Sequence, residues 1–312
     1  MRVVRLVSCL LFITAAARAE PTPSDPFSAF LPRGVRLAIP REEIRGGGPP
    51  VDGIPALVRP RKASIKEADR ALKPGDPVLG LEVGEEAVAY PIRLLNWHEL
   101  VDDEIGGVPV AVTYCPLCRS GIVFDRRAAG AVLEFGVSGL LYNSDLVMYD
   151  RSTRSLWSQI MAEAIAGPST GVKLARLPAR RTSWARWKAE HPGTKTVLFD
   201  TGHKRDYDAD PYANYEDSPE LYFPVSHEDS RLPRKTVVFG VSLSEGAAAA
   251  PVSALDAKGI RVRIGKRTVV IRDKGGARAF DEEGRELPGL EAYWFAWAAF
   301  HPDTLLVVPE KR

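Results

Sequence analysis

Apolar residues along this chain gather in short runs separated by turn residues, and few segments have the spacing of a helix. The runs are rich in β-branched and aromatic side chains, which favours strands over helices. The predicted strands cover 78–83, 86–90, 110–115, 120–124, 140–142, 146–149 and 156–157, the last three forming hairpins. The pattern therefore predicts the α+β class, with a β-rich body and short helices.

Two helices are predicted from signals at their first residues. Ser64 and Glu67 have the spacing of a capping box for a helix that runs through Leu72. Pro91 suits the first position of a second helix, because its missing N–H has no helical partner there. We expect this second helix to run to near Gly106, carrying several apolar residues on one face.

The first 19 residues have the layout of a secretory signal peptide. Arg2 and Arg5 precede an apolar run, and the run is followed by the small-residue exit Ala17-Arg18-Ala19. We expect cleavage after Ala19. This predicts an exported protein, periplasmic or extracellular.

Two further segments lack a sustained apolar period. Residues 20–62 are rich in Pro and Gly, which predicts an extended N-terminal arm laid over the body. Residues 201–234 are polar and predict a long loop. Loops of this length inside a compact body are usually functional or disordered.

Two groups of residues recur along the chain, which indicates two related β-rich halves. The first half would cover 63–200, and the second, smaller half would cover 235–312. The matching residues are Gly80, Ala87, Ala89, Pro91 and Leu95 with Gly240, Ala247, Ala249, Pro251 and Leu255, and Trp184, Trp187, His191 and Thr194 with Trp294, Trp297, His301 and Thr304. An internal duplication explains the recurrence, and chance similarity between β units is the alternative.

The charge of the chain is nearly balanced, with 42 Lys and Arg against 40 Asp and Glu. Removing Arg2, Arg5 and Arg18 with the signal peptide changes the formal net charge from +2 to about −1. This balance argues against nucleic acid or an anionic membrane surface as a partner. No later apolar run reaches the roughly 20 residues of a membrane-spanning helix, so no stable membrane span is expected.

The segment Cys115-Pro116-Leu117-Cys118 is the strongest chemical signal in the sequence. It lies at a turn between two predicted strands, where two sulfurs can bind one metal ion or close a small disulfide. Cleavage of the signal peptide removes Cys9 and leaves this pair alone. A four-sulfur site is thereby excluded, so a metal would need further ligands from His, Asp or Glu.

His98 is the predicted third ligand, because its helix directly precedes the strand that leads to the cysteines. Glu99 and Asp102 come from the same predicted helix, and Asp102 shares a face with His98. His203 and Asp206, in the polar loop, are further candidates. The predicted metal is zinc or copper, since both accept thiolate and imidazole ligands.

Two other uses of the cysteine pair stay open. An isolated pair in an exported protein also suits a dithiol-disulfide redox enzyme, with Cys115 and Cys118 as catalytic residues and a redox protein as its partner. The pair could instead form a structural disulfide in a noncatalytic binding module. The sequence indicates no substrate and no other partner.

A set of motifs spread over the chain after residue 50 is similar to one family. The motifs are Asp52-Gly53-Ile54-Pro55, Asn96-Trp97-His98-Glu99, Thr113 to Cys118, Phe135 to Gly139, Met148 to Arg151, Ser155 to Gln159, Asp210-Pro211-Tyr212 and Tyr293 to Trp297. On these motifs the chain resembles a domain-of-unknown-function family of exported prokaryotic proteins, numbered 3179. The resemblance implies export and no particular activity. The chain has Asp102-Asp103 where the family pattern has Asn-Asp, which weakens Asp102 as a ligand common to the family.

Overall fold

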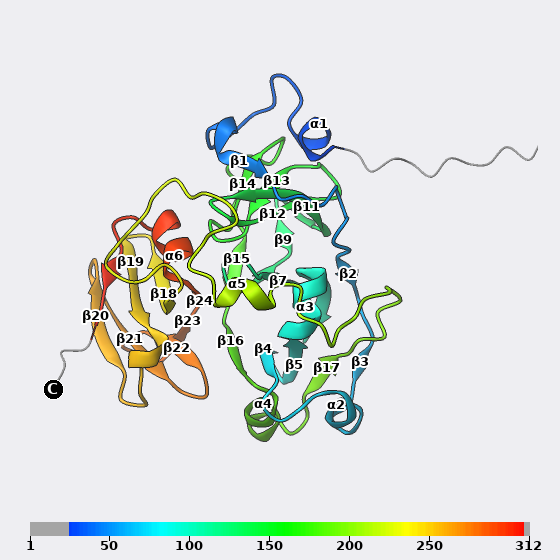
Figure 1. Cartoon of the computed structure of the whole chain (residues 1–312). Coiled ribbons are helices and arrows are strands. Elements are labelled where there is room, and N and C mark those ends of the chain that lie inside the picture. The colour runs from blue at the N-terminus through cyan, green and yellow to red at the C-terminus, as the bar shows by residue number, and fades with distance from the viewer. Residues whose placement is uncertain (1–24, 309–312) are drawn as a thin grey trace, which may run out of the picture.

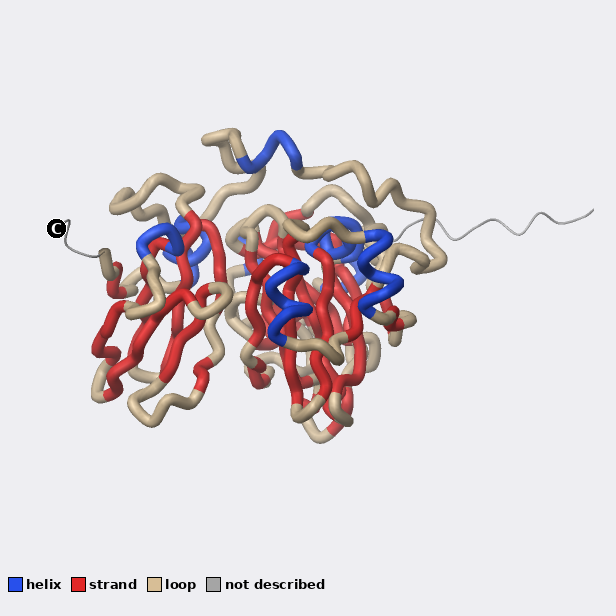
Figure 2. The backbone as a smooth tube through the Cα atoms, turned by 90° about the horizontal axis from the view of Figure 1, so that it is seen from below, coloured by secondary structure: helices blue, strands red, loops and turns tan. Residues whose placement is uncertain are grey.

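The computed structural model describes residues 25–308, so the predicted cleavage site after Ala19 lies outside the described residues. Strands are far more abundant than helices in this part of the chain, which confirms the β-rich α+β class. Two groups of strands stand side by side in both views (Figures 1 and 2). No helix among residues 25–308 is both long and apolar enough to cross a bilayer.

Three five-stranded sheets form the larger group of strands. The central sheet has the order β15 (Ala175–Leu177), β8 (Ser120–Asp125), β7 (Val108–Cys115), β6 (Leu100–Ile105) and β2 (Leu57–Val58). The hairpin sheet has the order β1 (Ile44–Gly46), β11 (Phe135–Tyr142), β12 (Asp145–Asp150), β13 (Leu156–Ser158) and β14 (Glu163–Ala166). The first repeat sheet has the order β16 (Ala179–Ser183), β4 (Pro77–Val83), β5 (Glu86–Pro91), β17 (Lys195–Val197) and β3 (Lys62–Ala63).

Two four-stranded sheets form the smaller, C-terminal group. The second repeat sheet has the order β24 (Leu290–Tyr293), β18 (Val237–Leu243), β19 (Gly246–Pro251) and β25 (Leu305–Leu306). The outer sheet has the order β20 (Ile260–Ile264), β21 (Arg267–Asp273), β22 (Ala277–Phe280) and β23 (Glu286–Leu287). A separate small ladder in the larger group pairs β9 (Arg127–Ala128) with β10 (Ala131–Val132).

The helices are short and connect the sheets. They are α1 (Pro26–Phe30), α2 (Ile65–Ala71), α3 (Ile92–His98), α4 (Trp184–Glu190), α5 (Ala213–Glu216) and α6 (Trp294–Phe300), with 3₁₀ turns η1 (Arg41–Glu43) and η2 (Val252–Ala254). At the start of α2, the Ser64 hydroxyl accepts a hydrogen bond from the backbone N–H of Glu67, and the Glu67 carboxylate accepts one from the backbone N–H of Ser64. The predicted capping box is therefore confirmed.

The predicted second helix is wrong at its C-terminal end. α3 stops at His98, Glu99 adopts a left-handed φ of 56°, and the chain continues as strand β6. The six residues of β6 pair in register with β7. Ladder hydrogen bonds to a long neighbouring strand outweigh the helical propensity of this segment. Asp102 consequently lies on a strand and shares no helix face with His98.

The N-terminal arm follows the surface of the larger group of strands (Figure 1). Its three short strands pair with the edges of three different sheets, β1 with β11, β2 with β6 and β3 with β17. Between them, the Asp52 carboxylate accepts hydrogen bonds from the Tyr149 hydroxyl at 2.7 Å and from Arg151. The arm thus covers edges that would otherwise present unpaired backbone groups.

The residues that recur in the sequence occupy matching places in the two repeat sheets. The β4–β5 hairpin pairs Gly80 with Ala89, and the β18–β19 hairpin pairs Gly240 with Ala249. The second strand of each hairpin also pairs with a parallel strand. β5 pairs with β17, which follows the Trp-containing helix α4, and β19 pairs with β25, which follows the Trp-containing helix α6. The two repeat sheets thus share their strand order and register, and their origin in an internal duplication stays a prediction. The cysteine turn lies in the long insertion between β5 and β16, and the outer sheet is the corresponding insertion of the second half.

One tryptophan of each repeat packs over its sheet in the same way. The Trp187 indole N–H donates to the Thr194 hydroxyl at 2.8 Å, and the Trp297 indole N–H donates to the Thr304 hydroxyl at 2.9 Å. Each threonine follows its tryptophan by seven residues, beyond the end of the helix. The hydrogen bond therefore fixes the indole and the start of the next strand together.

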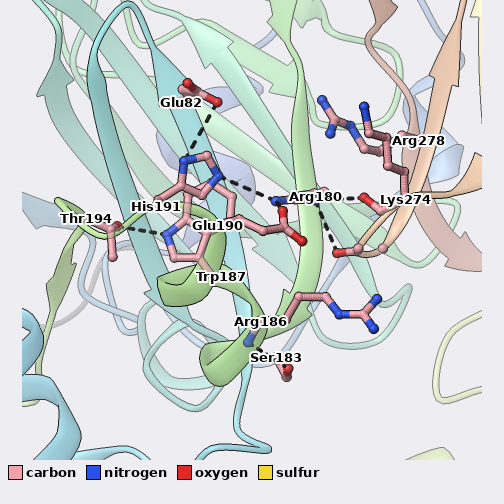
Figure 3. A network of polar contacts seen from close by, with 12 residues as sticks. Glu82, Arg180, Ser183, Arg186, Trp187, Glu190, His191, Thr194, Lys274 and Arg278 are labelled. Atoms are coloured by element: carbon pink, nitrogen blue, oxygen red, sulfur yellow. Dashed lines mark hydrogen bonds and ion pairs between the residues drawn. The ribbon is translucent and has the colours of Figure 1, made fainter.

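Arg180 on β16 joins the two halves through hydrogen bonds (Figure 3). Its guanidinium donates to the carbonyl oxygens of Lys274 and Gly275 in the second half and to the Glu190 carboxylate at the end of α4. His191 lies next to Arg180, with a ring nitrogen 3.5 Å from the guanidinium. Arg180 is buried, so this contact is part of the junction between the halves.

Gly80→Ala and Gly240→Ala are each expected to lower the free energy of unfolding by about 2 kcal/mol, measured by urea unfolding. A Cβ at Gly80 would lie 2.3 Å from the Trp187 ring, and a Cβ at Gly240 would lie 2.4 Å from the Trp297 ring. Gly193→Ala is the control, because a Cβ there has no atom within 4 Å. Equal effects of all three substitutions would contradict this packing.

Candidate metal centre

The two cysteines lie at a tight turn of the central sheet. β7 ends at Cys115, which pairs with Ser120 at the start of β8. Between them Arg119 adopts a left-handed φ of 57°, the position that Gly usually occupies. Cys115 and Cys118 are free thiols, and their side chains are 2% and 0% exposed. The turn thus places two sulfurs inside the protein.

A buried carboxylate from the hairpin sheet completes a group with these sulfurs. Asp145 is the first residue of β12, directly after the two-residue turn Asn143-Ser144, in which both residues have positive φ. A carboxylate oxygen of Asp145 and the sulfurs of Cys115 and Cys118 all lie within 4.8 Å of one another. Within residues 25–308, no other three His, Cys, Asp or Glu side chains come this close.

The same hairpin turn brings a main-chain oxygen to both thiols. The thiols of Cys115 and Cys118 donate to the Ser144 carbonyl oxygen at 3.7 and 3.3 Å. The Ser144 hydroxyl and the Asn143 amide nitrogen are buried and have no hydrogen-bond partner in the described structure. Buried polar atoms are normally paired, so these two unpaired atoms in the turn beside the cysteines are open to a water or another partner.

Burial controls the protonation of the two thiols. It raises the pKa of Cys115 above its ordinary value, and it raises the pKa of Cys118 further, with Cys115 adding to the effect. A charged sulfur in this environment lacks the solvation that water would supply. Without a metal, both sulfurs therefore carry a proton at neutral pH.

Burial also raises the pKa of Asp145 to about 7, although hydrogen bonds oppose the change. The carboxylate accepts from the Ser120 hydroxyl at 3.2 Å and from the backbone N–H of Ile160 at 3.0 Å. Arg176, half-buried, is near enough to Asp145 for their charges to interact. The carboxylate is therefore held in place by donors on one side and directed at the sulfurs on the other.

His98, the predicted third ligand, does not belong to this group. Its Nδ1 lies 2.7 Å from the carbonyl oxygen of Pro55, and its Nε2 lies 2.6 Å from the Tyr207 hydroxyl. Both ring nitrogens are thus engaged, and burial lowers the pKa of His98 to about 4. The histidine connects α3 to the N-terminal arm and to the polar loop, because its two partners come from these segments.

Glu99 lies beside the group without being one of its three members. Its carboxyl oxygen accepts from the Tyr212 hydroxyl at 3.3 Å, and burial raises its pKa to about 8. Its charge contributes to the raised pKa of Cys115, so the two side chains are near each other.

Asp102 also stays outside the group, on β6. It accepts from the backbone N–H of Phe135 at 2.7 Å and lies 3.6 Å from Arg126 Nε. Burial raises the pKa of Asp102 to about 7. Its partners therefore place it in the junction between the central and hairpin sheets.

The two candidates from the polar loop are exposed. The His203 ring lies 5.5 Å from the His98 ring, measured between centroids. An Asp206 carboxylate oxygen accepts from the backbone N–H of Asp208 at 3.1 Å. Neither residue is brought to the cysteines.

Asp145 is the residue of this site that the sequence did not identify. Its only local signal is a lone carboxylate between the turn Asn143-Ser144 and the apolar run 146–149. A charged residue at the start of a buried strand is unusual, because burying it costs free energy unless it is paired. That signal could have marked Asp145 as a candidate ligand.

Comparison with known proteins shows the family of the chain. A family model described as "Protein of unknown function (DUF3179)" matches residues 51–287. The match covers more than half of the chain, so the chain belongs to this family, as its motifs indicated. Searches of curated proteins and of solved structures gave no match.

Proposed function

We propose that this member of the DUF3179 family is an exported protein that binds one Zn²⁺ through Cys115, Cys118 and Asp145. The observation that carries the proposal is the convergence of two free thiols and a buried carboxylate, with ligand atoms within 4.8 Å of one another. The carboxylate comes from a different sheet than the thiols. A bound cation explains why an acid is buried against two sulfurs.

The spacing of the cysteines agrees with this role. Two Zn–S bonds of about 2.3 Å at a tetrahedral angle place the sulfurs roughly 3.8 Å apart. Cys115 and Cys118 lie 3.9 Å apart. Asp145 then needs to move by only about 1 Å toward the sulfurs, since ligand atoms of a tetrahedral zinc site are less than about 4 Å apart.

The donor set favours zinc over copper. Two thiolates and one carboxylate mix soft and hard ligands, which suits Zn²⁺, whereas Cu⁺ prefers sulfur alone. Together with Zn²⁺ these ligands carry one net negative charge, which nearby Arg176 offsets. Three protein ligands also leave a fourth position for water, another ligand or the Ser144 carbonyl oxygen.

The redox alternative is less well supported. Thiol–disulfide exchange needs a thiolate that a partner can reach. Cys115 and Cys118 are buried, and burial raises the pKa of both thiols. These properties suit a metal site, in which the ion itself displaces the protons.

The proposal predicts about one zinc ion per chain. The protein would be expressed without a tag and with its own signal peptide, and purified without chelators. We expect each of Cys115→Ser, Cys118→Ser and Asp145→Asn to lower zinc affinity by about 100-fold or more. Loss of a residue that only orients a metal ligand typically lowers the affinity by about 10- to 100-fold. Metal content would be measured by mass spectrometry, and affinity by competition with a chromogenic chelator.

Asp125→Asn is the matched control, because Asp125 lies on β8 but pairs with Arg127 and is not part of the group. It should leave zinc affinity unchanged. The proposal fails if zinc does not bind before or after reconstitution, if copper alone is retained, or if the natively isolated protein contains a Cys115–Cys118 disulfide.

A further inference from the structure

A pocket of about 290 Å³ opens beside the cysteine turn. Residues of α3, α5, β7 and β24 line it, so the polar loop and both groups of strands contribute to it. Pro116, between the two cysteines, forms part of its wall. A backbone hydrogen bond of 2.9 Å from Tyr293 to the Cys118 carbonyl joins β24 to the turn at this point. The pocket is therefore assembled only by the complete tertiary structure.

Four tyrosines line the pocket, together with three arginines and four acidic residues. The tyrosines are Tyr114, Tyr212, Tyr215 and Tyr293. Tyrosine rings present flat apolar surface, and their hydroxyls add a few directed polar contacts, as in most small-molecule sites. The volume is near the lower end of the range for such sites, which indicates a small ligand.

Arg181 is the charged group in this pocket that lacks an acidic partner. Its guanidinium donates to the Tyr114 hydroxyl at 3.1 Å, and no described carboxylate oxygen lies within 4.0 Å of it. The other two arginines of the pocket are paired, Arg93 with Asp208 and Arg119 with Glu216.

Two acids, Glu291 and Glu216, are near enough to Arg181 to raise its pKa, and Glu291 has the larger effect. Burial raises the pKa of Glu291, and the charge of Arg181 opposes this effect. Arg181 itself is half-buried and has several further N–H donors in a planar fork. This fork is suited to a carboxylate or a phosphate.

Tyr215, whose side chain lines the pocket, ends in a buried hydroxyl that lacks a partner among the described residues. The Tyr215 side chain is 1% exposed, and its hydroxyl has no hydrogen bond in the described structure. Lys235 packs against its ring, with Nζ 3.4 Å from the ring centroid. A buried hydroxyl without a partner costs free energy, and a ligand oxygen would remove that cost.

We propose that this pocket binds a small organic anion with a flat, apolar body and a carboxylate or phosphate head. Arg181 binds the head, the tyrosine rings contact the body, and the Tyr215 hydroxyl donates to an oxygen of the ligand. The proposal goes beyond zinc binding and uses none of the three proposed zinc ligands, although the Tyr215 hydroxyl lies near enough to Cys118 and Cys115 for their charges to interact.

The test uses the full chain freed of metal and four probes that share one ring. Benzoate and phenyl phosphate carry the anionic head, and benzyl alcohol and benzylammonium are the neutral and cationic matches. Binding would be followed by titration in protein NMR up to millimolar probe. At least one anion should bind at least tenfold more tightly than the neutral and cationic probes, and the preferred anion identifies the head group.

Arg181→Met should weaken binding of the preferred anion by at least tenfold, and Arg181→Lys by less, because lysine keeps the charge but not the fork. Tyr215→Phe should weaken it by about fivefold, the usual effect of one neutral hydrogen bond. The matched control is Arg186→Met, since Arg186 is exposed on α4 and lies outside the pocket. Thermal unfolding checks that each variant is folded.

Three results would overturn the proposal. They are the absence of binding by both anions, equal or tighter binding of benzylammonium, and unchanged anion affinity in both Arg181→Lys and Tyr215→Phe. The last two variants keep the test decisive if Arg181→Met does not fold. Because the measurements use metal-free protein, failure of zinc binding would leave their outcome unaffected.

Discussion

Zinc affinity is expected to rise by about 100-fold for each unit of pH between about pH 7 and 8. Burial raises the pKa of both Cys115 and Cys118 above the ordinary thiol value, so both sulfurs are protonated throughout this range. Zn²⁺ binds thiolate, and each bound ion must therefore displace two protons. The logarithm of the association constant should increase with a slope of about 2 against pH, measured by chelator competition at a series of pH values.

Below about pH 7 the slope should approach 3. The pKa of Asp145 is raised to about 7, so in more acidic solution its carboxyl must also lose a proton before it can bind the ion. Asp145→Asn should remove this extra dependence and keep the slope of 2 from the thiols. A slope near zero would mean that no thiolate is formed, and a slope near 1 that only one sulfur binds.

The metal-free protein is expected to lose stability as the pH rises from about 5 to 8, by an amount on the order of several kcal/mol. Burial raises the pKa of Glu99 to about 8 and the pKa values of Asp102 and Asp145 to about 7. Each folded-state pKa is above its unfolded value, so the contribution of each group is fully present below the unfolded pKa. That contribution is lost as the pH rises through the folded pKa.

Two buried histidines act in the opposite direction. Burial lowers the pKa values of His98 and His301 to about 4. Their contribution to stability is present above the unfolded value of about 6.5 and is lost as the pH falls through about 4. Between these values they partly cancel the effect of the acids. The decrease in stability should therefore be steepest above about pH 6.5.

Urea unfolding at a series of pH values, with a chelator present, measures this profile. Asp102→Asn should flatten it and make the protein more stable than the unsubstituted chain at about pH 8, because asparagine has no proton to lose. Asp125→Asn is the control, since pairing with Arg127 lowers the pKa of Asp125. Stability that increases from about pH 6 to 8 would contradict the assignment of these three acids.

The elements that the sequence predicted well are those with local causes. Ser64 and Glu67 are three residues apart, and a capping box requires nothing beyond that spacing and a following helix. The hairpin around Asn143-Ser144 likewise follows from two strand-like runs and a short polar turn. The helix after Pro91 was predicted too long, because the hydrogen bonds that convert its second part into β6 come from β7, a separate strand.

In the candidate site, too, only the part with a local cause was predictable from the sequence. The turn that brings Cys115 and Cys118 together depends on four adjacent residues and two flanking strands, so the sequence by itself determined it. Asp145 joins them because the hairpin sheet packs on the central sheet. His98 does not take part, because both of its ring nitrogens contact other groups, the Pro55 carbonyl oxygen and the Tyr207 hydroxyl. Only the tertiary structure decided these two outcomes, since packing between distant segments sets which side chains meet and what each costs to bury.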